Sequence, residues 1–174
     1  MWLLFPTLIF AIVIEIAIVC CRSLARKVPV NFILLALFTF SFSFIVAFCT
    51  VPYDAAAVLQ SGGATALTTI ALTVYAWRTD EDHTMCGGML YILSAAITML
   101  ILTLTLFSPS TLYAPFVCAL LVVFYGLFLV YDTQLVAGKG HHKLSIDDYI
   151  LGALIIYLDI IMLFLQLLKL FGRK

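Results

Sequence analysis

Charged residues are scarce in this 174-residue sequence: nine lysines and arginines stand against nine aspartates and glutamates, which makes 10 % of the chain and a net charge of zero. A soluble domain carries about 25 % charged residues. The neutral balance also argues against a basic nucleic-acid-binding surface, so no nucleic-acid partner is expected. Hydrophobic residues make up 65 % of the chain, and the mean hydropathy is +1.21. The composition therefore predicts an integral membrane protein, with residues 1–174 forming a single transmembrane domain.

Residue types that build metal and redox sites are also few. The five cysteines are scattered, with no Cys-x-x-Cys motif and no Cys/His cluster, so a metal or redox site is not expected. The three histidines all stand between apolar stretches, which argues against a serine–histidine hydrolase inside the membrane. We therefore expect no enzyme and no cofactor. The cysteines, interpreted as small apolar packing residues, are Cys20, Cys21, Cys49, Cys86 and Cys118.

Six apolar stretches are long enough to cross about 30 Å of hydrocarbon, which takes about 20 helical residues. Short connections favour an antiparallel bundle. Lysine and arginine in the loops after the first, third and fifth stretches place those loops on the inner side of the membrane. The basic carboxy terminus does not fit this pattern, because six crossings would place it outside. The expected helices cover residues 2–21, 30–49, 56–77, 85–107, 113–136 and 148–170.

Two aspartates, Asp132 and Asp159, stand inside the last two apolar stretches. A carboxylate in hydrocarbon costs about 3 kcal/mol on insertion scales, so it persists only where it faces a polar interior, a partner or an ion. We expect the two carboxyl groups to meet inside the bundle, where they would release their protons in two separate steps. Two carboxylates supply only part of the roughly 6–8 oxygen ligands that calcium takes, so the predicted calcium site is weak.

Other polar residues have helical spacing toward the same expected interior. Glu15, Arg22 and Arg26 lie at i, i+7 and i+11, and share one face if the first helix continues past the membrane edge. Gln166 follows Asp159 by seven residues and shares its face. We expect Glu15, Arg22 and Gln166 to line a polar pathway. The alternative is a structural network of buried hydrogen bonds that fixes the helix register.

Small and hydroxyl residues are concentrated in the third stretch, where Thr65, Thr69 and Thr73 repeat every four residues. The favoured interpretation is close helix packing, with the threonine hydroxyls bonded to backbone carbonyls. A water-lined wall is the alternative.

Three segments of the carboxy-terminal half form a specific combination: Tyr-Asp-Thr-Gln-Leu at 131–135, His-Lys-Leu-Ser-Ile-Asp-Asp-Tyr-Ile at 142–150 and Gly-Ala-Leu-Ile-Ile-Tyr-Leu-Asp-Ile-Ile at 152–161. Upstream, the segments 15–21, 26–31 and 37–39 continue the similarity over nearly the whole chain. The sequence resembles the Bax inhibitor-1 superfamily, also called the transmembrane Bax inhibitor motif family, and is most similar to its lifeguard branch.

That resemblance implies an all-α integral membrane protein with a central last helix. It also implies that Asp132 and Asp159 act as proton sensor and weak calcium site, and that Arg26 latches onto the pair in the closed state. The match starts at the family's second helix, so a six-helix version of a seven-helix bundle is expected. The place of the first helix would then be open to a neighbouring membrane protein.

The implied function is a pH-sensitive calcium leak involved in calcium homeostasis and the suppression of cell death, with calcium as the transported or weakly bound ion. The alternative is a non-conducting accessory or scaffold subunit of a larger complex. An intramembrane aspartyl protease is disfavoured, because Asp159 does not follow a Gly-x-Gly segment. The expected location is the endoplasmic reticulum or Golgi membrane, with the mitochondrial inner membrane as alternative.

Overall fold

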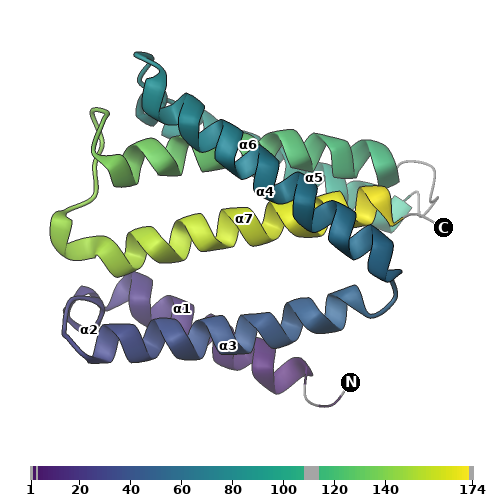
Figure 1. Ribbon diagram of the computed structural model, residues 1–174, viewed down its shortest axis with the longest axis horizontal. Coiled ribbons are helices and arrows are strands. Elements are labelled where there is room, and N and C mark those ends of the chain that lie inside the picture. The colour runs from purple at the N-terminus through teal and green to yellow at the C-terminus, as the bar shows by residue number, and fades with distance from the viewer. Residues whose placement is uncertain (1, 3, 108–113, 173–174) are drawn as a thin grey trace.

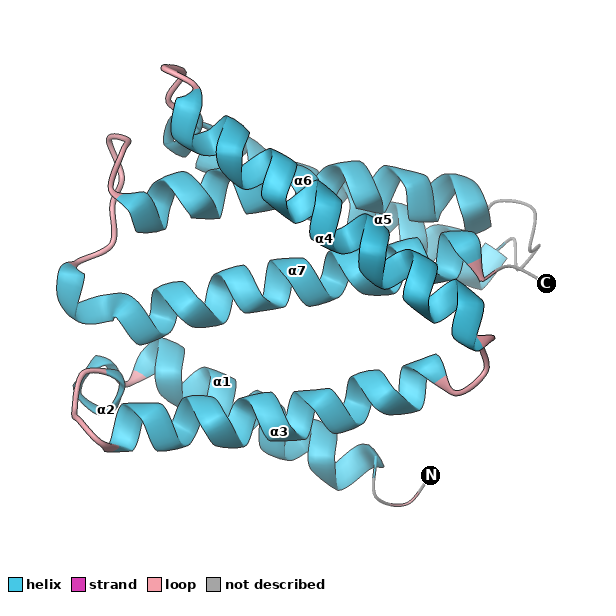
Figure 2. Cartoon of the chain, in the orientation of Figure 1, coloured by secondary structure: helices cyan, strands magenta, loops and turns pink. Residues whose placement is uncertain are grey.

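The computed structural model describes residues 2, 4–107 and 114–172. All regular structure in this part of the chain is helical (Figure 2). The predicted outer loop at 108–112 and the basic residues Arg173 and Lys174 lie outside the described residues. The helices are α1 Leu4–Cys20, α2 Arg22–Ala25, α3 Val30–Thr50, α4 Ala55–Arg78, η1 His83–Cys86, α5 Gly87–Phe107, α6 Ala114–Ala137, η2 Ile146–Asp148 and α7 Tyr149–Phe171.

Helix ends follow the punctuation of the sequence. Pro29 caps the start of α3, and Ser145 caps η2 by accepting a hydrogen bond from the Asp147 N–H. Gly138 ends α6 in the left-handed region, with φ 68°, which favours glycine. Among the described residues, five helical segments are long and apolar enough to cross a membrane, whereas α1 spans only 17 residues.

Helix α7 is the central element, which confirms that part of the expected architecture. It contacts α1 and α3 on one side and α4 and α6 on the other, as Figure 1 shows. A hydrophobic core joins α1, α3 and α7 through Ile18, Phe38 and Leu154, all nearly inaccessible to solvent. A second core joins α5 and α6 through Ile97, Leu121 and Phe124. The first core attaches α1 and α3 to α7, and the second attaches α5 to α6.

The connections that carry the inner-side basic residues lie at one end of the bundle. The loop through α2, the α4–η1 loop and the α6–η2 loop are all at the left in Figure 1, and hydrogen bonds join neighbouring loops there. This inner end, made of residues 21–29, 79–86 and 138–148, agrees with the loop charges that set the predicted orientation.

Candidate functional site

The carboxyl groups of Asp132 and Asp159 meet inside the bundle. Helices α6 and α7 pack along each other, and the two side chains lie close enough for their carboxyl groups to interact. Asp159 is only 8 % exposed, whereas Asp132 is half-buried. The predicted proximity of the two acids is therefore confirmed. Their roles as proton sensor and calcium site stay predictions.

Close helix packing brings the pair together. Gly152, Asp159 and Gln166 recur every seven residues on α7 and are all buried, as their spacing predicts. A β-carbon at Gly152 would stand 3.1 Å from a Val136 methyl group, so the glycine allows α7 to approach α6 closely. Tyr125 of α6 lies near enough to Asp159 for an electrostatic interaction. The pair thus has a polar neighbour on the facing helix.

Three buried polar atoms on α4 and α7 have no hydrogen-bond partner among the described residues. They are Oδ2 of Asp159, Oε1 of Gln166 and Oγ1 of Thr69. An unsatisfied buried polar group costs about 1–3 kcal/mol. All three atoms can accept a hydrogen bond or bind a cation, so the interior beside α7 offers oxygen ligands beyond the two carboxyl groups.

The threonines of α4 differ from one another. Thr65 donates to the Ser61 carbonyl at 2.7 Å, as the packing interpretation predicts. Thr69 has no such bond, so the packing interpretation is wrong at that position.

A groove of about 350 Å³ lies between α4 and α7, lined by Gly62, Thr65, Ala66, Thr69, Ile70, Ile160, Ile161 and Phe164.

Arg26 binds a different aspartate from the one expected. Its Nε and one terminal nitrogen donate to the two carboxylate oxygens of Asp148 at 2.8 and 2.9 Å. The predicted contact with Asp132 and Asp159 is not made in this structure. Asp148 opens the last helix at the inner end, and Asp159 lies eleven residues deeper, about 16 Å along a helix axis. A base at the mouth therefore meets Asp148 first.

This Arg26–Asp148 pair is one of two links between the same segments. Asn31 of α3 donates to the Tyr149 hydroxyl of α7 at 2.6 Å. The hydrogen bond from Arg26 to Asp148 raises the pKa of Arg26 above its usual value, so the guanidinium stays charged at every relevant pH. Asp148 is 5 % exposed, and Arg22 adds a further attraction to it.

The continuous stripe predicted from Glu15 to Arg26 does not form. Helix α1 ends at Cys20, and Cys21 has non-helical backbone angles of φ −102° and ψ 72°, so α2 starts a new axis. Glu15 is half-buried on α1 and makes no hydrogen bond or ion pair with any described residue. The spacing argument assumed a helix that continues past Cys21, and the break removes its basis.

Comparison with known proteins shows the family of the chain. The family described as "Inhibitor of apoptosis-promoting Bax1" matches residues 1–174. The chain belongs to this family. Protein lifeguard 3 of Homo sapiens is 35 % identical over 166 residues, which are 94 % of this chain and 53 % of the relative. Its Mus musculus counterpart is 33 % identical, over 94 % and 54 % of the two chains.

A viral relative shows the same similarity. The Golgi anti-apoptotic protein of Vaccinia virus (strain Lister) is 35 % identical over 147 residues, 83 % of this chain and 59 % of the relative. The chain spans about half the length of the lifeguard proteins it matches.

In this member of the Bax1-inhibitor family, Gln134 ties the inner-end loops to the bundle. The side chain is 2 % exposed. Its oxygen accepts the His83 N–H at 2.8 Å, and its nitrogen donates to the carbonyls of Glu81 at 3.0 Å and Ala76 at 3.4 Å. The amide thus satisfies backbone groups where α4 ends and η1 begins. Sequence reasoning gave Gln134 no such role, although a glutamine at the end of an apolar stretch was a usable signal.

Asp82 makes a second link between the same loops. Its carboxylate accepts from the Thr84 hydroxyl at 2.5 Å, the Thr84 N–H at 3.0 Å and the His141 N–H at 2.9 Å. These bonds, first the one from the Thr84 hydroxyl, hold the pKa of Asp82 below its usual 3.8. A lowered pKa stabilises the fold above the unfolded-state value, and that stability is lost only as the pH falls through the folded-state value. The link therefore persists at neutral and mildly acidic pH.

We expect Gln134→Ala to destabilise the protein by about 2–4 kcal/mol, because several buried backbone groups lose their partner at once. Thermal or denaturant unfolding in detergent measures the change. Gln60→Ala is the matched control, since Gln60 is exposed on α4 and its loss should change stability by no more than about 0.5 kcal/mol. Equal stabilities of the two variants would contradict the assigned role.

Proposed function

We propose that this protein is a pH-sensitive calcium-leak protein that suppresses cell death, with Asp132 and Asp159 as its proton- and calcium-binding group. The observation that carries the proposal is the meeting of two carboxyl groups in the interior of a membrane bundle. Two such groups that lie close together can share one proton, and when fully ionised they repel each other unless a cation lies between them. Proton and calcium therefore compete for the same oxygens.

The surroundings of the pair support transient calcium binding. No group of three or more His, Cys, Asp or Glu side chains that could hold a metal occurs in the described part of the chain. Calcium at the pair would complete its shell with water and neutral oxygens. A site that binds weakly releases its ion readily, as permeation requires.

The Arg26–Asp148 pair supplies the closed state in this proposal. It joins the segment after α1 to the start of α7 at the inner end, and the Asn31–Tyr149 hydrogen bond reinforces the junction. Opening a path from the inner side to Asp159 requires these segments to separate. The latch role expected for Arg26 is kept, with Asp148 as its partner.

The names of the relatives support the cellular part of the proposal. The viral relative is called a Golgi anti-apoptotic protein, and the family description names inhibition of a pro-apoptotic protein. We propose the same role here, in endoplasmic reticulum or Golgi membranes.

Two measurements test the function. Purified protein in liposomes containing a calcium-sensitive dye should release calcium faster than empty liposomes, at a rate that changes with pH. Cells that express the protein should survive a Bax-dependent death stimulus better than cells carrying an empty vector. Flux equal to that of empty liposomes at every pH would overturn the leak, and unchanged survival would overturn the protective role.

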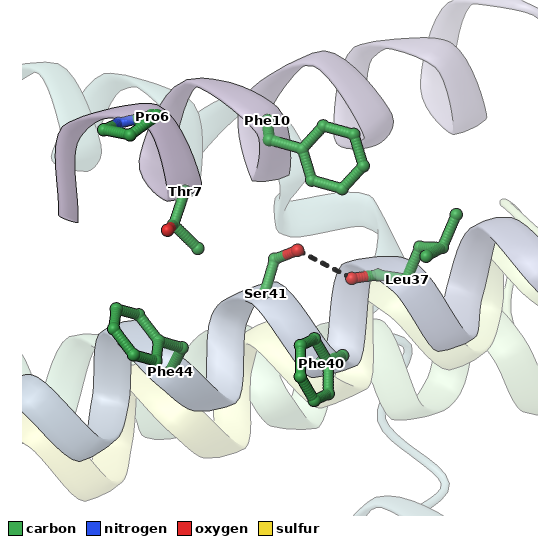
Figure 3. Close-up of a pocket in the computed structure, with 7 residues that line it drawn as sticks. All are labelled: Pro6, Thr7, Phe10, Leu37, Phe40, Ser41 and Phe44. Atoms are coloured by element: carbon green, nitrogen blue, oxygen red, sulfur yellow. Dashed lines mark hydrogen bonds between the residues drawn. The ribbon is translucent and has the colours of Figure 1, made fainter. Parts of the chain in front are cut away.

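A second candidate is a non-conducting accessory subunit. A groove of about 600 Å³ between α1 and α3 favours it (Figure 3). Ser41, on the wall of this groove, donates to the Leu37 carbonyl of its own helix at 2.8 Å, which leaves a largely apolar surface for a neighbouring transmembrane helix. Absent flux together with copurification in fixed stoichiometry with one other membrane protein would select this candidate. The groove is lined by Pro6, Thr7, Phe10, Leu37, Phe40, Ser41 and Phe44.

A further inference from the structure

Two adjacent cysteines stand where the first membrane helix ends. Cys20 is the last residue of α1, and Cys21 precedes α2 with non-helical backbone angles. Both side chains are exposed and neither forms a disulfide. The chain turns away from the α1 axis at this point, so both thiols lie at the inner end of α1.

The segment that follows the two thiols is rich in basic residues, of which Arg26 is paired with Asp148. Arg22, Arg26 and Lys27 follow within seven residues and are exposed. They belong to the inner end of the bundle, together with the other loops that carry lysine and arginine (Figure 1). Basic residues beside the cytoplasmic leaflet are attracted to its anionic lipids. This attraction holds the cysteines close to the lipid headgroups.

The other three cysteines lack this combination. Cys118 is buried on α6. Cys49 is half-buried near the end of α3, at the opposite end of the bundle. Cys86 is exposed at the inner end, but it follows the acidic loop 80–82. Cys118, Cys49 and Cys86 therefore serve as controls for Cys20 and Cys21 in accessibility, membrane side and local charge, respectively.

We propose that Cys20 and Cys21 are S-acylation sites, which receive long-chain fatty acyl groups at the inner surface of the membrane. Juxtamembrane cysteines are the acceptors that this modification uses. The thiolate sulfur attacks the carbonyl carbon of a fatty acyl-CoA, a new thioester forms on cysteine, the acyl–CoA thioester breaks, and coenzyme A leaves as its thiol. No oxidant or reductant is needed. The proposal is independent of whether the protein conducts calcium.

The test is acyl exchange on the full chain in membranes of eukaryotic cells. Free thiols are blocked, thioesters are cleaved with neutral hydroxylamine, and the released thiols are tagged with a maleimide polymer that shifts the gel mobility. Wild type should show a hydroxylamine-dependent shift of up to two tags, because two cysteines meet the conditions. Each single variant, Cys20→Ser and Cys21→Ser, should carry at most one tag, and the double variant none.

Three further variants complete the design. Cys49→Ser, Cys86→Ser and Cys118→Ser should keep the wild-type pattern. If the double variant fails to accumulate, the single variants still decide, since each must lose one tag. The absence of a hydroxylamine-dependent shift in the wild type would overturn the proposal. A wild-type shift in both single variants would overturn it as well. So would loss of the shift in Cys49→Ser, Cys86→Ser or Cys118→Ser.

Discussion

Asp159→Asn is expected to remove most of the pH dependence of calcium release from liposomes, because Asp132 alone remains to bind protons. In the wild type, protons and calcium compete for the oxygens of Asp132 and Asp159, so the calcium concentration for half-maximal flux should rise as the pH falls. A neutral amide at position 159 cannot bind a proton in this range and removes one of the two charges. Because a hydrogen bond to a charged group contributes about 1.5–3 kcal/mol, the calcium concentration for half-maximal flux in the wild type should change by roughly ten- to a hundredfold across the transition.

Asp54→Asn provides the matched control. Asp54 is exposed at the opposite end of the bundle, before α4, and its side chain makes no capping hydrogen bond. The same change of charge there should leave the pH profile as in the wild type. A profile for Asp159→Asn that still moves with pH to the wild-type extent would rule out the pair as the proton sensor, and a flat wild-type profile would do the same.

The helices and the acid pair could be predicted because a large free-energy cost determines each of them. Spanning hydrocarbon requires a long apolar run, so all six predicted helix ranges agree with the described helices to within two residues at each described end. A lone carboxylate inside such a run is expensive, and a neighbouring acid on the next helix was the available polar partner. The proximity of Asp132 and Asp159 follows from those two costs.

The partner of Arg26 could not be predicted with the same argument. Asp148 and Asp159 lie on one face of α7, so spacing alone made both available. Which aspartate Arg26 contacts depends on how deep Arg26 lies in the bundle. The helix break at Cys21 sets that depth, because it ends α1 before Arg22. No strong residue signal marks that break: it falls between Cys21 and Arg22, far from any glycine and before Pro29. The loop links made by Gln134 and Asp82 could not be predicted from residue spacing either, because they join segments more than fifty residues apart.

Reversing the charges of the inner-end ion pair is expected to raise the basal calcium leak. Arg26→Asp places two carboxylates face to face, and Asp148→Arg places two cations together, so each single variant separates the start of α7 from the segment after α1. Each should increase flux at neutral pH by at least about twofold, the lower end of coupling between contacting residues. The double variant, Arg26→Asp with Asp148→Arg, restores opposite charges and should return the flux toward that of the wild type.

Lys27→Asp combined with Asp147→Arg is the control for net charge and position. Both residues are exposed neighbours of the ion pair, and the structure shows no ion pair between them. This double change should leave basal flux at the wild-type rate. Recovery in the Arg26/Asp148 swap alone would show that the contact itself closes the inner end, because a general effect of surface charge would move both double variants alike. If the two single reversals leave basal flux unchanged while Asp159→Asn removes most of the pH dependence, the aspartate pair senses protons without a latch at the mouth, and Arg26 serves only to position α7.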